Sequence, residues 1–180
     1  VGIAVDHVHL PDTTTQQDLL DRVQALNEDA KIHGIIIQMP LESKEKIDDA
    51  VAESSVAPEK DVDGFHVMNT GKLFKRGTAL PELIPCTPKG ILHMLDVEGV
   101  DITGKNCVVL GRSNIVGRPM SELLLRRNGT VTMVHSRSVD VPSICRNADI
   151  LVAAVGEPNM VRKEWVKPGA VIIDAGINAI

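Results

Sequence analysis

Short apolar segments alternate with amphipathic segments along most of the chain, which is the pattern of an α/β protein. Residues 32–39 are almost continuously apolar, as in a parallel strand covered on both faces, and residues 2–10 alternate loosely. Further buried strands are predicted at 106–110, 131–134, 150–155 and 170–173. We therefore expect parallel strands with helices packed on their faces.

Helices are predicted between these strands from their apolar periodicity and capping residues. Asp12 or Thr13 can cap the first helix, whose apolar side contains Leu19, Leu20, Val23 and Leu26. A second helix includes Ile47, Ala50 and Val51. Thr87-Pro88 offers an N-cap hydroxyl and a proline at the first helical position, and Gly99 ends that helix.

The segment between Gly111 and Pro119 joins the predicted strand 106–110 to an amphipathic helix. Gly111 allows a tight turn and a close approach of a ligand to the backbone, and Gly117 opens the helix. Free N–H groups at such a helix start can bind a phosphate. The spacing differs from G-x-G-x-x-G, so a plain structural turn stays an alternative to a dinucleotide site.

The residues after the next strand favour NADP over NAD. NAD-binding units usually have Asp or Glu at the end of the second strand, where it accepts a hydrogen bond from the ribose. Here the strand 131–134 is followed by Ser136 and Arg137, and Arg112 stands in the glycine loop. Hydroxyl and guanidinium groups pair with a 2′-phosphate that a carboxylate would repel. The alternative is that Arg137 is a solvated loop residue.

Composition narrows the class of protein further. The 180 residues are 43% hydrophobic and carry a net charge of −5, and no basic run exceeds two residues, which argues against a nucleic-acid partner. No apolar run reaches the roughly 18 residues that span a membrane. The three cysteines are widely separated and suit a reducing compartment such as the cytoplasm. Neither they nor the six histidines show the spacing of a metal site.

Polar clusters follow the predicted strands of the N-terminal part and suggest an active site. Gln38 ends the apolar run 32–39 and offers a hydrogen-bond donor and an acceptor. Asp61 and Asp63 alternate in the loop 58–65, and a third cluster spans 84–90. Each cluster could instead simply end a strand or form a solvated loop. We predict an N-terminal α/β domain at 1–86, a Rossmann-like domain at 87–180, and a site in the cleft between them.

Six stretches, in order along nearly the whole chain, resemble the bifunctional methylenetetrahydrofolate dehydrogenase/cyclohydrolase family. They are His33-Gly34-Ile35-Ile36-Ile37-Gln38-Met39-Pro40-Leu41, Pro58-Glu59-Lys60-Asp61-Val62-Asp63-Gly64, Pro85-Cys86-Thr87-Pro88, the Gly111–Pro119 loop, His135-Ser136, and Asp174-Ala175-Gly176-Ile177-Asn178. The Ser136-Arg137 pair resembles the members that use NADP. Phe65-His66 is similar to the mitochondrial NAD-linked branch.

The resemblance implies an activity and a role for each site residue. Family members oxidise 5,10-methylenetetrahydrofolate with NAD(P)⁺ to the methenyl cation and hydrolyse that cation to 10-formyltetrahydrofolate. By this resemblance, Gln38 partners the catalytic lysine, Ile37 and Met39 line the folate, and Asp63 holds the pterin ring. The cofactor-binding residues implied are Gly111, Arg112, Ser113, Ser136 and Ile177. The resemblance also implies a homodimer in the cytoplasm or the mitochondrion.

Two family motifs do not occur in this chain. The catalytic lysine of the family lies in a Tyr-x-x-x-Lys motif upstream of Val1, and the chain contains no tyrosine. A Pro-Gly-Gly-Val-Gly-Pro stretch that completes the folate pocket lies beyond Ile180. We therefore expect both ends to be cut, and neither folate reaction to run at a useful rate from these residues alone. Two alternatives are a non-catalytic NADP-binding module and an unrelated NADP-dependent reductase.

Overall fold

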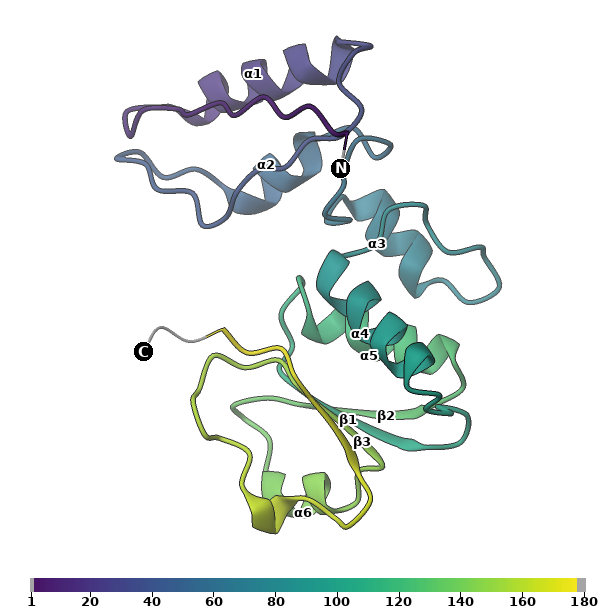
Figure 1. Ribbon diagram of the computed structural model, residues 1–180. Helices are drawn as coiled ribbons and strands as arrows, with labels where there is room; N and C mark the ends of the chain where they lie inside the picture. The colour runs from purple at the N-terminus through teal and green to yellow at the C-terminus, as the bar shows by residue number, and fades with distance from the viewer. Residues whose placement is uncertain (1, 178–180) are drawn as a thin grey trace. The chain divides into compact units, whose positions relative to one another are not determined.

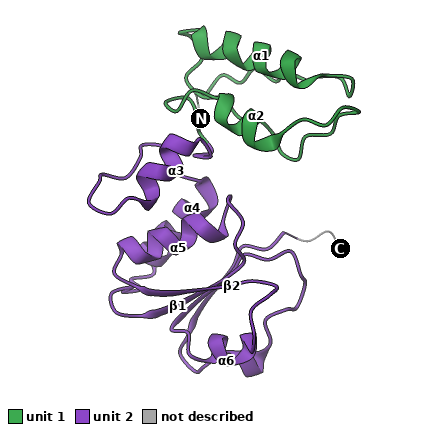
Figure 2. Cartoon of the chain, turned by 180° about the vertical axis from the view of Figure 1, so that it is seen from behind, with its two compact units in different colours: residues 1–62 green, residues 63–180 purple. Residues whose placement is uncertain are grey.

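The computed structural model describes residues 2–177, which divide into two compact units at 62/63 (Figures 1 and 2). Unit 1 contains the helices α1 (Gln16–Glu28) and α2 (Asp49–Ser55). Unit 2 contains α3 (Val67–Phe74), α4 (Cys86–Val97), α5 (Gly117–Arg126), α6 (Val141–Arg146) and the short 3₁₀ helix η1 (Lys163–Trp165). Its four strands are β1 (Asn106–Leu110), β2 (Thr130–Val134), β3 (Ile150–Ala153) and β4 (Val171–Asp174).

The strands of unit 2 form one parallel sheet in the order β2-β1-β3-β4. The chain leaves β1 toward β2 on one side and returns to β3 on the other, so the strand order reverses between β1 and β3. Helices α4 and α5 cover one face of the sheet, and α6 covers the other (Figure 1). The sequence-based prediction of a Rossmann-like parallel sheet is confirmed. The crevice at such a reversal is where open α/β sheets bind ligands.

Alternation of side chains along the strands produces two apolar layers, one on each face of the sheet. Cys107 and Val109 of β1 pack in the layer below α4 and α5. Their neighbours Val108 and Leu110 pack in the layer that contains Cys145 of α6. Both faces of the central strands β1 and β3 are therefore buried, which explains why these two strands read as continuous apolar runs in the sequence.

Residues 63–84 belong to unit 2, although the sequence led us to expect the domain boundary at 86/87. Leu73 of α3 and Ile84 are buried in the same core as α4 and α5. The guanidinium group of Arg126, at the end of α5, also donates hydrogen bonds to four carbonyl oxygens of this segment: Lys72, Leu73, Lys75 and Thr78. The segment is attached by contacts with residues far along the chain, which local sequence patterns do not reveal.

Unit 1 departs from the prediction in its strands and in one cap. Within residues 2–62 the described backbone forms one β contact, a parallel bridge between Ile35 and Asp61, in place of the strands expected at 2–10 and 32–39. A strand needs a partner along its length, and only this point has one. Helix α1 is capped by Thr15 in a reciprocal bond with Asp18, rather than by Asp12 or Thr13.

Helix α4 begins two residues earlier than the predicted Thr87-Pro88 start. Pro85 is its N-cap residue, Cys86 is its first residue, and Pro88 is buried in its first turn. Proline is tolerated there because the first N–H groups of a helix have no partner within the helix. None of the helices within residues 2–177 is long and apolar enough to span a bilayer.

The start of the sheet is fixed by Asp149, whose protonation we expect to control stability in acid. Its carboxylate accepts hydrogen bonds from the Lys167 ammonium and the Asn106 N–H, and both lower its pKa, the lysine bond most. A pKa lower in the folded than in the unfolded chain stabilises the fold above about pH 4 and is lost in stronger acid. Asp149→Asn should therefore lower the melting temperature near neutral pH and make little difference below about pH 3.

Differential scanning calorimetry at the two pH values measures this effect. Lys167→Met removes the other partner of the pair and should reproduce the same pH dependence. A melting difference between Asp149→Asn and the unchanged chain that persists in strong acid would contradict this assignment.

Candidate nucleotide and folate sites

Gly111 begins the turn at the strand reversal, and no other residue fits its position. Its φ is +111°, and a Cβ built on it would lie 2.3 Å from the carbonyl oxygen of Ala154, just after β3. Gly117 is equally confined, because its Cβ would lie 2.4 Å from the Gly111 carbonyl oxygen. The two glycines therefore bring the end of β1, the start of α5 and the end of β3 together. Ala154 was not predicted to take part in this site. The sequence signal that could have indicated it is the pair of small residues after the apolar run 150–152.

Ser113 accepts hydrogen bonds from the N–H groups at the start of α5 that we expected to remain free for a phosphate. Its Oγ accepts hydrogen bonds from the Val116 and Gly117 N–H groups at 3.1 and 3.2 Å, and its carbonyl accepts one from Arg118. The next residue, Pro119, has no N–H. The start of α5 is thus satisfied within the protein, and the prediction of free helical N–H groups was wrong.

Further hydrogen-bond donors come from the loop itself. In the described turn 111–117, the backbone N–H groups of Arg112 and Ser113 have no acceptor within the protein, and both side chains are exposed. Because the Ser113 oxygen already accepts two bonds, its hydroxyl hydrogen remains available to donate to a ligand. Two N–H groups, a hydroxyl and a guanidinium form a donor set suited to phosphate oxygens.

Ser136 lies at the same edge of the sheet. Val134, the last residue of β2, pairs with Leu110, and its carbonyl accepts a 2.8 Å hydrogen bond from the Gly111 N–H. The residues after β2 are therefore tied directly to the glycine turn. Ile177 follows β4 at the carboxyl edge and is 93% exposed, whereas Asn178 of the same motif lies outside the described residues.

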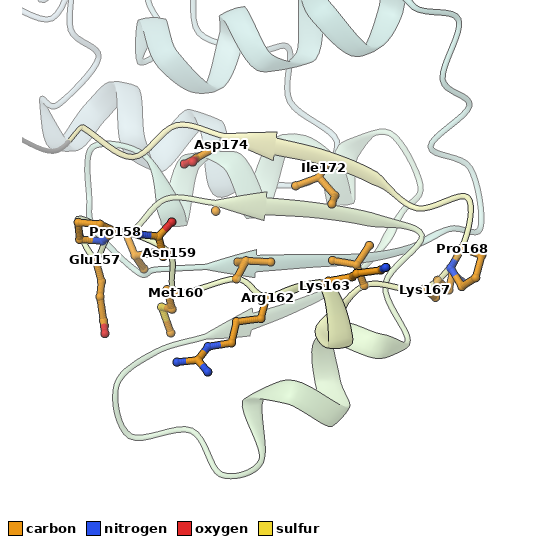
Figure 3. Close-up of a pocket in the computed structure, with 14 residues that line it drawn as sticks. Glu157, Pro158, Asn159, Met160, Arg162, Lys163, Lys167, Pro168, Ile172 and Asp174 are labelled. Atoms are coloured by element: carbon orange, nitrogen blue, oxygen red, sulfur yellow. The ribbon is translucent and has the colours of Figure 1, made fainter.

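A cavity of about 620 Å³ lies beside the last strands of the sheet, apart from the predicted nucleotide residues (Figure 3). Ala153, Ile172 and Asp174 line it from β3 and β4, and Asn159 lines it from the loop after β3. None of the five residues predicted to bind the cofactor lines this cavity. The turn after β1, rather than this cavity, is the candidate phosphate site.

The folate residues predicted in unit 1 lie along the segment that bridges to Asp61. Gln38 is exposed, and its amide nitrogen donates to the Met39 carbonyl at 3.1 Å. Ile37 and Met39 are half-buried against the core of unit 1, and Ile37 and Gln38 line a cavity of about 380 Å³ within this unit. The Gln38 amide oxygen thus remains available as an acceptor.

Lys60 ties two of the predicted clusters together within unit 1. Its ammonium donates hydrogen bonds to the carbonyls of Leu26, Asn27 and Asp29 at the end of α1. Its own carbonyl accepts a 2.7 Å hydrogen bond from the Ile35 N–H. A cation at a helix C-terminus is favourable because the last carbonyls are unpaired and carry partial negative charge. The lysine of this motif therefore acts structurally.

Asp63 lies in unit 2, half-buried, next to the start of α4. Its neighbour Gly64 has a φ of +72°, and a Cβ there would lie 2.7 Å from the Pro85 ring. Within unit 2, the structure thus brings Gly64 of the cluster 58–65 against Pro85 of the cluster 84–90, which are separate in the sequence. Cys86 is exposed at this junction, and Cys107 is buried in the sheet, where burial raises the pKa of its thiol to about 11.

A parallel sheet with a glycine turn at its strand reversal defines unit 2 as a Rossmann-type domain, the class that binds dinucleotides. Comparison with known proteins is consistent with this class. Residues 85–180 match the NAD(P)-binding domain of the tetrahydrofolate dehydrogenase/cyclohydrolase family, and residues 1–63 match its catalytic domain. The chain belongs to this family.

Individual relatives of known sequence or structure support membership of this family. The bifunctional protein FolD of Brucella ovis is 55% identical over 172 residues, which cover 95% of this chain and 56% of that protein. The crystal structure of the FolD dehydrogenase/cyclohydrolase from Campylobacter jejuni superposes with a TM-score of 0.89 at 38% identity, covering 96% of this chain and 60% of its own.

The FolD of Trypanosoma brucei, solved with NADP and an inhibitor, has a TM-score of 0.88 at 42% identity, covering 95% and 57% of the two chains. The present chain thus spans a little more than half the length of the relatives it matches.

Proposed function

We propose that this chain is the part of a methylenetetrahydrofolate dehydrogenase/cyclohydrolase that binds NADP and contributes to the folate site. The observation that carries the proposal is the turn at Gly111, where a Cβ would collide with Ala154. Arg112 and Ser113 follow β1, and Ser136 follows β2, at the same edge of the sheet, where the Gly111 N–H donates to the Val134 carbonyl. Membership of the family and the NADP in the Trypanosoma brucei structure support it.

The residues present fit NADP better than NAD. The absence of a side chain on Gly111 lets the turn pack against Ala154, and the N–H groups of Arg112 and Ser113, which have no acceptor in the protein, can donate to a pyrophosphate. The exposed Arg112 and Ser136 can neutralise and bind a 2′-phosphate. Ile177, after β4, would contact the nicotinamide end. When bound, NADP⁺ supplies a hydride acceptor.

The chain's own residues bind and orient the folate in this proposal. Asp63 accepts hydrogen bonds from the pterin N–H groups, a charge-assisted contact. Gln38 presents its amide to the catalytic lysine of the longer protein, and Ile37 and Met39 line the ring. Hydride leaves the methylene carbon, and water then adds to the carbon of the resulting methenyl cation with loss of a proton. Cleavage of the bond from this carbon to N5, which takes up a proton from the new hydroxyl group, leaves the formyl group on N10.

The direct test is nucleotide affinity, measured by calorimetric titration of the chain with NADP⁺ and NAD⁺. We expect NADP⁺ to bind at least about tenfold more tightly than NAD⁺, a difference of about 1.4 kcal/mol. Arg112→Ala should reduce NADP⁺ affinity about tenfold and NAD⁺ affinity less, because only NADP⁺ carries the 2′-phosphate. Equal affinity for the two nucleotides, unchanged in this variant, would overturn the cofactor assignment.

The folate part is tested by hydride transfer from methylenetetrahydrofolate, followed as NADPH formation. Because the chain contains no tyrosine of a Tyr-x-x-x-Lys motif, NADP⁺ binding without turnover is the expected behaviour of these residues alone. In a longer protein that includes this chain, Asp63→Ala should abolish turnover and leave NADP⁺ affinity intact. We further infer a homodimer in the cytoplasm, where the three free cysteines stay reduced, and propose no nucleic-acid or membrane partner.

A further inference from the structure

The four residues after β2 form a tight turn whose hydrogen bonds all involve His135. The Ser138 N–H donates to the His135 carbonyl at 2.8 Å, and the His135 N–H donates to the Ser138 Oγ at 3.0 Å. The Arg137 N–H donates to the His135 Nδ1 at 3.1 Å. The turn is therefore closed by one backbone bond and by two side chains that accept from the backbone.

The residues that shape this turn differ from those that it presents. His135 and Ser138 are half-buried, whereas Ser136 and Arg137 occupy the two central positions and are exposed. The turn starts directly after Val134, whose carbonyl accepts the Gly111 N–H. Its orientation relative to the glycine turn is thus set by the sheet, and its internal shape is set by the His135 and Ser138 side chains.

We propose that His135 and Ser138 are positioning residues that determine selectivity for a nucleotide bearing a 2′-phosphate. They hold the backbone of the turn, so that the Ser136 and Arg137 side chains start from fixed backbone positions before the ligand arrives. Donors that are ordered in advance lose less conformational entropy on binding, and this gain applies to the 2′-phosphate that they contact. The inference rests on the proposed function, because it assumes that the ligand is NADP.

The test compares variants that remove an acceptor with variants that keep it. His135→Leu and Ser138→Ala each remove one side-chain acceptor of the turn. His135→Asn keeps an oxygen that can accept from the N–H two residues on, and Ser138→Thr keeps the hydroxyl. We expect the first two to weaken NADP⁺ binding about tenfold and NAD⁺ binding less than about twofold. The second two should stay within about twofold of the unchanged chain for both nucleotides.

His66→Leu is the matched control. The His66 Nδ1 accepts the Met68 N–H at 3.1 Å, also two residues on, but it caps α3 outside this turn. This variant should not alter the ratio of NADP⁺ to NAD⁺ affinity. The positioning role is overturned if His66→Leu changes the ratio as His135→Leu does, if both nucleotides weaken equally, or if Ser138→Ala leaves NADP⁺ binding unchanged.

The outcomes also separate this inference from the proposed function. If the unchanged chain does not bind NADP⁺, the proposed function fails and the inference fails with it. If the chain binds NADP⁺ and Arg112→Ala weakens binding while His135→Leu and Ser138→Ala do not, only the positioning role is rejected. Should His135→Leu fail to fold, Ser138→Ala and Ser138→Thr still decide the question.

Discussion

Replacing Gly111 by alanine is expected to destabilise unit 2 by about 3 kcal/mol and to remove measurable NADP⁺ binding. The new Cβ would lie 2.3 Å from the Ala154 carbonyl oxygen, and the φ of +111° is one that L side chains rarely adopt. The end of β1 must then move away from the end of β3, which opens the turn that presents Arg112 and Ser113. Urea unfolding gives the stability change, and calorimetric titration gives the affinity.

Alanine substitutions at Gly117 and Gly90 test whether steric crowding at the turn causes the loss of stability and of NADP⁺ binding in Gly111→Ala. Gly117→Ala places a Cβ 2.4 Å from the Gly111 carbonyl oxygen and should also destabilise unit 2 and weaken NADP⁺ binding. Gly90 lies in α4 with no heavy atom within 4 Å of its Cβ position, so Gly90→Ala should stabilise the chain by roughly 0.5–1 kcal/mol. Unchanged stability and affinity in Gly111→Ala would contradict the close approach of β1 and β3.

Arg126→Ala is expected to cost about 3 kcal/mol and to detach the segment 63–84 from α5. The Arg126 side chain is only 19% exposed and donates to four backbone carbonyls. Those of Leu73 and Thr78 accept part-buried bonds and would be left without a donor, whereas those of Lys72 and Lys75 are exposed to water. Arg126→Lys keeps the charge but has no planar fork of donors, so its loss of stability should be intermediate. Urea unfolding measures the cost, and limited proteolysis measures release of the segment.

The neighbouring Arg127 provides the control. Its side chain is 44% exposed and forms a surface ion pair with Asp96, so Arg127→Ala should cost less than about 1 kcal/mol and leave the protease pattern unchanged. Equal losses in the two alanine variants would show that the four carbonyl bonds of Arg126 do not hold the segment. Because Asp63 lies in that segment, Arg126→Ala should also weaken the folate binding that we propose for Asp63.

The sequence predicted unit 2 better than unit 1, and the reason is the kind of contact each uses. The four strands of unit 2 were each located to within about two residues. The central strands β1 and β3 are buried on both faces and leave uninterrupted apolar runs, whereas the edge strands β2 and β4 keep exposed positions. The run 32–39 is similarly apolar, yet Ile35 is its only buried residue and its only point of pairing. An apolar run indicates that burial of the segment is favourable, but it does not show whether a second segment is available to pair with it as a strand.

The sequence by itself determined the residue types of the candidate site: the Gly111 turn, the cations and hydroxyls after β1 and β2, and the polar residues Gln38 and Asp63. These are local requirements, since backbone angles and charge are properties of adjacent residues. Tertiary structure decided that Arg126 holds residues 63–84 on unit 2. The folded geometry of two loops decided that Ser113 occupies the first N–H groups of α5 and that His135 shapes the turn around Ser136, although these bonds join residues at most four positions apart. Each of these depends on which polar atoms meet when the chain is folded, and hydrogen bonds are too short-ranged and directional to be read from spacing along the sequence.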